Sequence, residues 1–158
     1  MTVLANPGAR LLTINALGFK FYLEMAGVIS AEFLGMSGLT VSREVTEVIE
    51  GGTNDFTYKL GGHIKFENIV LKNGIAYNRD LWDWFTVGLY DGKVKRKNIS
   101  IILGNGEHKK VKQWDVYAAF PVKWSGPELD VKVSDVAVET LELAHHGFSL
   151  SAEEENPM

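Results

Sequence analysis

The chain has 158 residues, which suits one domain, and it has no cysteine, which excludes disulfide frameworks and thiolate metal sites. Apolar residues make up 46% and charged residues 23%, as in an ordinary globular protein. A formal charge of −4 argues against a protein built mainly to grip nucleic acid, and no apolar run is long enough to span a membrane. We therefore expect residues 1–158 to form a single domain.

The first quarter of the chain predicts a flexible arm and two strands. Residues 1–17 contain Asn6-Pro7-Gly8, and their charge order does not fit a signal peptide. Residues 19–25 alternate apolar and polar side chains, which is typical of a half-buried strand. Ala26-Gly27 permits a turn, and a second strand is predicted from 28 to 36, before Ser37-Gly38.

A third extended segment, 40–49, alternates without giving a cleanly apolar face. It is either an edge strand whose charges block aggregation or a long hairpin arm that pairs with a neighbouring subunit. Turn-forming residues 51–55 would be its tip. The candidate interface residues of this segment are Val41, Arg43, Glu47, Glu50, Gly51, Gly52, Asn54 and Asp55.

The most informative stretch, 58–74 followed by Leu81-Trp82-Asp83-Trp84, reads as a strand that leads into a helix and contains no catalytic grouping. The strand is predicted over 65–71, and the helix over 79–90 with Asn78 as N-cap and Asp91-Gly92 as terminator. On that helix Trp82 and Trp84 lie about 200° apart, so one of them should sit at an interface or under a loop.

The last part of the chain predicts more strands. Strands at 98–103 and 110–119 flank Gly104-Asn105-Gly106, which favours a type I′ hairpin. A final strand is expected over 136–143, followed by an acidic, disordered tail at about 151–158. The sum is a mainly β fold, either a small antiparallel β-sandwich or a barrel, with one α-helix.

No grouping of residues predicts catalysis, a cofactor or a metal ion. The histidines, His63, His108, His145 and His146, are interpreted as ordinary surface or partly buried side chains. Asp80 and Asp83 share a helix face, but complementing the helix dipole explains them better than acid–base chemistry. The loop at 104–109 lacks the ending of a phosphate-binding loop.

Seven of the sixteen basic residues gather between positions 93 and 112, with Glu107 as the only acid in that range. They indicate a solvated hairpin, a basic patch that meets an acidic patch on the next subunit, or, less well, a nucleic-acid surface. The cluster comprises Lys93, Lys95, Arg96, Lys97, Lys109, Lys110 and Lys112. The candidate interface residues within it are Lys95, Arg96, Lys97, Lys109 and Lys110.

The order and spacing of several short motifs resemble the inner-tube proteins of contractile tails, over about residues 19–150. The motifs are Gly51-Gly52, Lys59-Leu60-Gly61-Gly62, Asn68-Ile69-Val70-Leu71-Lys72-Asn73-Gly74, Leu81-Trp82-Asp83-Trp84, Arg96-Lys97-Asn98-Ile99, Ala119-Phe120-Pro121-Val122-Lys123-Trp124-Ser125-Gly126-Pro127-Glu128-Leu129 and Val136-Ala137-Val138-Glu139-Thr140-Leu141-Glu142-Leu143-Ala144-His145. One departure is Val48-Ile49-Glu50, where the family has Glu-Tyr-Arg. It suggests a specialised subunit, such as one that starts the tube.

The resemblance implies a structural, non-enzymatic subunit with a fold similar to the haemolysin-coregulated protein. Its copies would form hexameric rings stacked into a hollow tube inside a contractile sheath. The implied partners are further copies, the sheath protein, baseplate, spike and cap proteins, and a cargo of effector protein or phage DNA in the lumen. Assembly is expected in the cytoplasm, without membrane insertion, before incorporation into a phage tail or injection particle.

Two other functions stay open from the residues alone: a small β-barrel that binds a ligand, and, less well supported, an enzyme on a sandwich scaffold. The tube interpretation carries one structural expectation. Sheet edges should be left open in the lone subunit, because identical copies complete them. We place the stacking contacts in the segment from Val41 to Asp55, with 95–112 as a second assembly surface.

Overall fold

The computed structural model describes residues 18–52, 55–106, 109–127 and 138–151. The expected flexible arm at 1–17 and most of the acidic tail lie outside these residues. The described elements, in chain order, are β1 (Lys20–Met25), β2 (Val28–Ser37), β3 (Val41–Val48), β4 (Tyr58–Phe66), β5 (Ile69–Ala76), α2 (Asp80–Thr86), β6 (Lys97–Gly104), β7 (Lys110–Ser125), β8 (Glu139–Ala144) and β9 (Phe148–Leu150).

Most of the chain forms one antiparallel barrel. The strand order β6-β1-β2-β5-β8-β7 closes on itself, because β6 also pairs with β7, and β9 adds to β7 beside Trp114–Val116. The expectation of open sheet edges is therefore wrong for the barrel, since its margins pair with each other. Among the described strands, unpaired edges are left only on the short β9 and on a separate ribbon.

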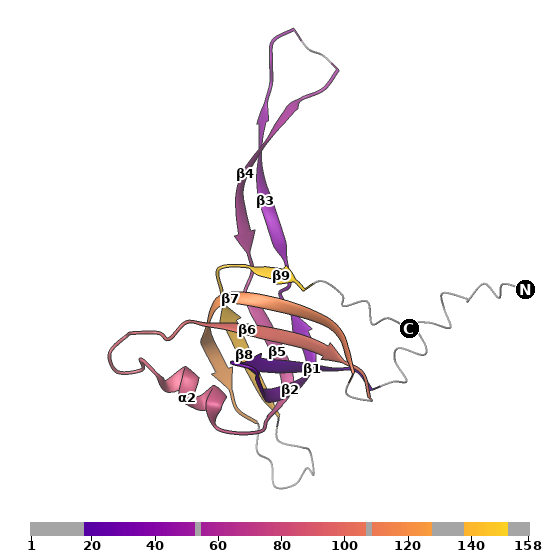
Figure 1. Ribbon diagram of the computed structural model, residues 1–158. Helices are drawn as coiled ribbons and strands as arrows, with labels where there is room; N and C mark the ends of the chain where they lie inside the picture. Colours follow the sequence, from indigo (N-terminus) through magenta and orange to yellow (C-terminus); the bar gives the residue numbers. More distant parts are fainter. Residues whose placement is uncertain (1–17, 53–54, 107–108, 128–137, 152–158) are drawn as a thin grey trace, which may run out of the picture.

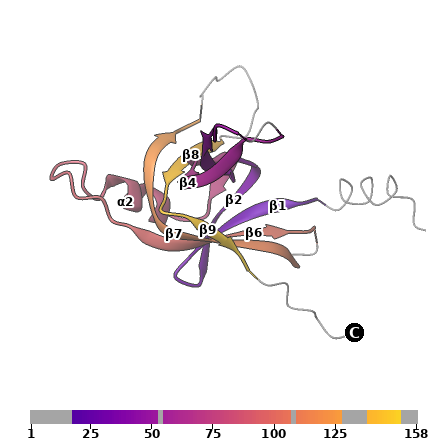
Figure 2. The same cartoon turned by 90° about the horizontal axis from the view of Figure 1, so that it is seen from above.

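That ribbon is a two-stranded hairpin of β3 and β4, which we call the arm (residues 41–66). It rises from one end of the barrel, far beyond the other described elements (Figure 1). The structure thus shows the long hairpin of the second interpretation of segment 40–49, with β3 as one of its strands. Pairing with a neighbouring subunit stays a prediction. Seen from above, the arm stands over the β2 and β8 side of the barrel (Figure 2).

The barrel interior is filled with apolar side chains. Leu23, Phe33, Ile69, Ile101 and Leu143 are at most 1% exposed and belong to one cluster to which every barrel strand contributes. A barrel of this size is filled by its own side chains, so their burial holds the fold together.

The helix is shorter than the sequence predicts, because it ends at Thr86 rather than at Tyr90. Val87 has an extended backbone, and Gly88 follows it with φ +90°. Gly88 lies so close to Lys93 that a Cβ on Gly88 would be 2.2 Å from the Lys93 carbonyl oxygen. Leu81 and Trp84 face the core as expected. Asn78 does not occupy the N-cap position itself, although its Oδ1 accepts a hydrogen bond from the Asp80 N–H at 3.0 Å.

Two turns behave differently from each other. Ala26 and Gly27 both have positive φ and join β1 to β2 tightly, which confirms that turn. The type I′ prediction at Gly104–Gly106 is wrong. β6 ends at Gly104, which pairs with Lys110 at the start of β7, and the Asn105 N–H donates to the Lys109 carbonyl at 3.0 Å, so no two-residue turn joins the strands.

The stretch 58–74 is also interpreted incorrectly from its sequence. It contains two strands of different sheets, β4 in the arm and β5 in the barrel, separated at Glu67 and Asn68. The predicted strand 65–71 straddles this boundary. The final strand begins at Glu139, and the start predicted for it at 136 lies outside the described residues.

Candidate assembly surfaces

The arm is anchored to the barrel by close packing at its base. The Phe66 ring meets the rings of His145 and Phe148 edge-on, at 5.7 and 5.6 Å between centroids. Gly38, with φ +87°, passes so close to Asn68 that a Cβ would lie 1.8 Å from its carbonyl oxygen. Only glycine fits such a crossing, so the junction sets where the arm leaves the barrel.

Beyond its base, the arm has no described protein to pack against, and every residue of β3 is exposed. Large apolar side chains are nevertheless frequent on it, up to Ile49 at 84% exposure. Phe56 and Tyr58 stack edge to face near the tip at 4.9 Å. The exposed apolar residues of the arm are Val41, Val45, Val48, Ile49, Phe56, Tyr58, Leu60 and Ile64. A concentration of this kind is typical of a surface that another protein covers.

The candidate interface residues predicted between positions 41 and 55 lie on the arm where the structure describes them. Val41, Arg43 and Glu47 belong to β3, and Glu47 lies 4.0 Å from Lys59 in an exposed ion pair of little energetic weight. Glu50, Gly51, Gly52 and Asp55 are exposed near the tip, whereas Asn54 lies outside the described residues. Their role in assembly stays a prediction. Sequence reasoning missed the β4 partners, because it placed no strand over 58–64.

A glycine pair interrupts the pairing of the arm. Arg43 pairs with Ile64 and Val45 pairs with Gly61, so Gly62 and His63 together oppose Glu44 in a β-bulge. The Arg43 guanidinium donates to the Gly62 carbonyl at 3.5 Å, and a Cβ on Gly61 would lie 3.2 Å from the Arg43 side chain. The motif Lys59-Leu60-Gly61-Gly62 therefore marks a backbone irregularity.

The basic cluster divides into two separate groups. Lys93, Lys95, Arg96 and Lys97 lie just before or at the start of β6. Lys109, Lys110 and Lys112 lie near its far end, where Lys110 and Lys112 of β7 pair with Gly104 and Leu103. Since β6 is eight residues long, roughly 23 Å separate its two ends. A single basic patch over 93–112 is therefore wrong.

The basic residues at the start of β6 make different contacts from one another. The Arg96 guanidinium lies over the Phe120 ring at 4.4 Å and contacts His146 Nε2 at 3.0 Å, so it is engaged inside the subunit. The Lys97 ammonium lies 5.4 Å from the Trp84 ring centre. The indole N–H of Trp84 donates a hydrogen bond to the Lys95 backbone carbonyl at 2.6 Å, and the Lys95 side chain lines a cleft.

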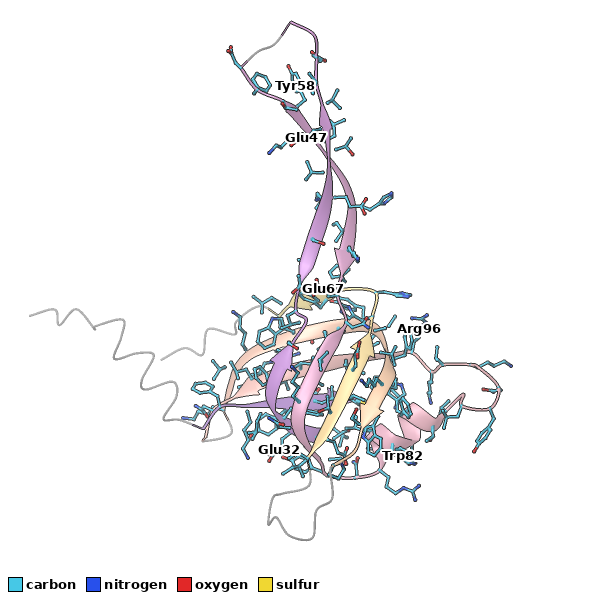
Figure 3. All side chains as sticks on the ribbon, turned by 180° about the vertical axis from the view of Figure 1, so that it is seen from behind. Glu32, Glu47, Tyr58, Glu67, Trp82 and Arg96 are labelled. Carbon is cyan, nitrogen blue, oxygen red and sulfur yellow. The ribbon has the colours of Figure 1, made fainter. Side chains whose placement is uncertain are left out.

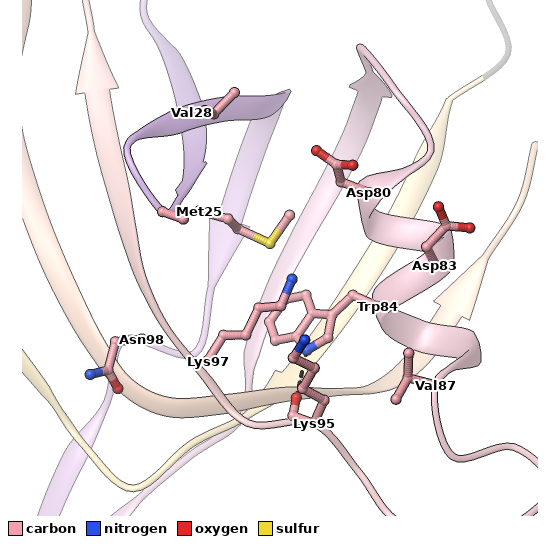
Figure 4. A pocket seen from close by; sticks show the side chains of 10 residues that line it. Met25, Val28, Asp80, Asp83, Trp84, Val87, Lys95, Lys97 and Asn98 are labelled. Atoms are coloured by element: carbon pink, nitrogen blue, oxygen red, sulfur yellow. Dashed lines mark hydrogen bonds between the residues drawn. The ribbon is translucent and has the colours of Figure 1, made fainter.

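That cleft, of about 700 Å³, is open and lies between α2 and the β1–β2 turn (Figure 4). Asp80 and Asp83 line it from the helix, and Lys95 and Lys97 line it from the segment before β6. The opposed charges balance, and Asp83 also lies 3.5 Å from Arg79. Both carboxylates are exposed and lie in the first turn of α2, which favours the helix-dipole interpretation over acid–base chemistry.

The two helix tryptophans point to different environments, as the sequence predicts. Trp84 is 2% exposed, whereas Trp82 is 41% exposed and meets Trp124 edge-on at 4.9 Å. Trp82 lies at the end of the molecule opposite Tyr58 of the arm (Figure 3). This aromatic pair is a second exposed apolar surface, on the far side of the barrel from the arm.

Two networks bind carboxylates on the barrel surface. Asp115 accepts hydrogen bonds from Ser100, Gln113 and Ser151, each at 2.7 Å, and the Gln113 bond above all lowers the pKa of Asp115. Glu32 accepts from Lys20 at 3.0 Å and from the Tyr77 hydroxyl at 2.6 Å. Desolvation, reinforced by that bond, raises the pKa of Tyr77 to about 12. Both networks join strands to each other, which gives them a structural explanation.

The described residues offer no grouped ligands for a metal ion. No three His, Asp or Glu residues gather there in a geometry that could hold a metal ion. His145 Nε2 lies 2.8 Å from the Glu67 carbonyl, which ties this histidine to the base of the arm. Over the same residues, no helix combines the length and apolarity that crossing a membrane requires.

A closed antiparallel barrel with a filled core, one short helix and a long exposed hairpin defines a class of protein that presents surfaces for assembly. Within this class, the chain belongs to the family of the T4-like virus tail tube protein gp19, whose model matches residues 17–149. It is a structural tube protein, as its sequence motifs predict. Among curated proteins none matches the chain.

Solved structures share the fold. A chain of the sheath–tube complex of an extracellular contractile injection system, PVC, in the extended state, has 24% identity and TM-score 0.68, covering 94% of this chain and 99% of that one. A chain of the PVC sheath/tube terminator has 26% identity and TM-score 0.68, covering 84% and 94%. A chain of the 6-fold symmetrised baseplate of the anti-feeding prophage has 23% identity and TM-score 0.65, covering 98% and 99%.

Proposed function

We propose that this chain forms hexameric rings that stack end to end into the hollow inner tube of a contractile injection system or phage tail, with the arm as the ring-to-ring contact. The observation that carries the proposal is the arm itself. It extends from one end of a closed barrel, with its apolar residues uncovered. Apolar area left in water at this scale favours association at about 25 cal/mol per Å².

The arrangement also suits growth in one direction. A contact between the arm of one copy and a different surface of the next is heterologous, and heterologous contacts form rings or continue as open stacks. Family membership and the PVC and anti-feeding prophage neighbours support a sheath, a baseplate and a cap as further partners, and the proposal adds a spike. The lumen would carry effector protein or phage DNA. In this proposal the subunit has no enzymatic activity, and it assembles in the cytoplasm before it becomes part of the particle.

The experiment replaces residues 43–64 with Asn-Gly, which removes the arm and leaves a short hairpin between Ser42 and Lys65. We expect negative-stain microscopy to show tubes of the wild-type protein and only rings or monomers of the armless variant, at unchanged urea stability. Deletion of residues 50–55 should shorten the tubes. Tubes of normal length from the armless protein would refute the stacking role, and a wild-type protein that stays monomeric at high concentration would refute the proposal as a whole.

A further inference from the structure

The pairing of the arm assigns each side chain to one of the ribbon's two faces. Directly opposed residues share a face, and neighbours along a strand alternate. The first face carries Val41 with Phe66, then Arg43 with Ile64, and near the tip Glu47 with Lys59. The second face carries Ser42 with Lys65, then Thr46 with Leu60, and Val48 with Tyr58. The first face thus carries Val41, Ile64 and Phe66 beside Arg43 near the base, and beyond the bulge it carries Val45 and the Glu47–Lys59 pair. The second face is polar near the base and carries Val48, Tyr58 and Leu60 near the tip.

The bulge causes this exchange. In β4 the apolar residues Tyr58, Leu60, Ile64 and Phe66 all occupy even positions, so regular pairing would keep them on one face. Because Gly62 and His63 together oppose Glu44, the alternation of β4 slips by one residue at that point. Tyr58 and Leu60 consequently lie on the face opposite to Ile64 and Phe66.

The ribbon also twists. In Figure 1, and again from behind in Figure 3, β3 and β4 cross and exchange sides between the base and the tip. When the two edges of a ribbon exchange sides, the face that looks toward the viewer at the base looks away at the tip. The first face at the base and the second face at the tip therefore look toward the same side of the arm. The bulge compensates the twist, and the more apolar half of each face comes to one side, whereas Val45, beside the bulge, is left on the other.

We propose that this apolar side of the arm (Val41 and Ile64 near the base, Val48, Tyr58 and Leu60 near the tip) packs lengthwise against one surface of a second copy of this chain, and that the Gly61–Gly62 bulge makes the arm one-sided. The inference rests on the proposed stacking function and adds the side of the arm that binds. The other side, with Glu47, Lys59 and Lys65 and with Val45 beside the bulge, stays in contact with water.

Two observations favour a second copy as the occupant. The arm leaves the end of the barrel as a continuation of the β2–β5 ribbon, since three residues join β2 to β3 and two join β4 to β5. At eight residues each, β3 and β5 both span about 23 Å. A copy stacked on this end would therefore lie beside the arm over the length of its own strands. A partner that approaches the barrel wall from the side would contact little of the arm.

Four serine substitutions in the full-length protein test the inference. Ile64→Ser and Leu60→Ser lie on different faces and in different halves, but both lie on the apolar side. Lys65→Ser and Lys59→Ser are the matched controls beside them in sequence. We expect the first two to lose tubes and leave rings in negative-stain images, and the two controls to form tubes of normal length. All four positions are exposed, so urea midpoints should stay unchanged.

Two insertion variants test the role of the bulge, because only one of them moves the side chains near the tip to the opposite faces of the ribbon. One threonine inserted after Glu44 restores regular pairing and moves the distal pairs to the opposite faces, whereas the same insertion between Gly51 and Gly52 lengthens the arm without moving them. Tubes should be lost only with the first insertion. The inference would be overturned if loss of tubes among the serine variants followed the ribbon face or the half of the arm instead of the apolar side. It would also be overturned if the two insertion variants formed tubes equally well. Normal tubes combined with lost sheath binding in Ile64→Ser and Leu60→Ser would also overturn it. Each of these outcomes leaves the armless variant to decide the stacking role separately.

Discussion

At the scale of single residues, Asp115 shows how a surface carboxylate stabilises the barrel. Its three hydrogen bonds connect β6, β7 and the residue after β9, and they favour the ionised form. Because its folded pKa lies below the unfolded value near 3.9, the stabilisation is present above that value and is lost as pH falls through the folded pKa.

We therefore expect Asp115→Asn to lower the free energy of unfolding by about 1 kcal/mol at pH 7. The difference from the wild type should shrink as the pH is lowered below 4, because the protonated wild-type side chain then resembles the amide. Urea unfolding at pH 7, 5 and 3 measures this difference. A difference that stays constant over this range would show that the charge of Asp115 does not contribute.

Gly38 is the residue on which the position of the arm depends. An alanine there would have to adopt φ +87° and place its Cβ 1.8 Å from the Asn68 carbonyl oxygen. We expect Gly38→Ala to cost about 2–4 kcal/mol and to reduce tube formation, although no arm residue changes. Urea unfolding and microscopy measure the two effects.

Gly35→Ala is the matched control for this substitution. A Cβ at Gly35 would make an ordinary 3.6 Å contact with the Lys72 side chain, and Gly35 has no positive φ. This variant should differ from the wild type by less than about 1 kcal/mol and should assemble normally. Equal destabilisation by the two alanines would mean that the crossing at Asn68 is not tight.

At the scale of elements, the sequence predicts what depends on local pattern and fails where distant parts decide. Alternation located β1 and β2 within one or two residues, and the Ala26-Gly27 turn follows from its residue types. The boundary between β4 and β5 has no turn signal, because the chain passes from one sheet to another while staying extended. The early end of α2 depends on the contact between Gly88 and Lys93, which no periodicity reveals.

The candidate site shows the same division. A polar, exposed hairpin over 41–55 could be predicted, because neither face of β3 is apolar by itself. The apolar side of the arm could not be predicted, since it depends on register with β4, on the bulge and on twist. Charge clustering in sequence likewise misplaced Lys109 and Lys110, because β6 carries them away from Lys95 and Lys97.

At the scale of the whole molecule, the protein consists of two parts with different stability. The barrel strands are all paired on both sides and enclose one core, so they should open only by global unfolding. The arm strands pair only with each other within the described residues and bury almost nothing beyond the base. An isolated two-stranded ribbon is marginally stable in water.

Hydrogen exchange should therefore separate these parts in the unassembled subunit, with amides of β3 and β4 exchanging at least a hundredfold faster than core amides of β1, β5 and β6. In tubes the arm amides should become protected over their whole length, because a neighbouring copy then covers the apolar side and opening the ribbon must break that contact. The Leu60→Ser variant, studied as rings, should keep the fast exchange of the free arm. If the arm were as protected as the barrel in the lone subunit, it would be rigid on its own, and assembly would not be needed to order it.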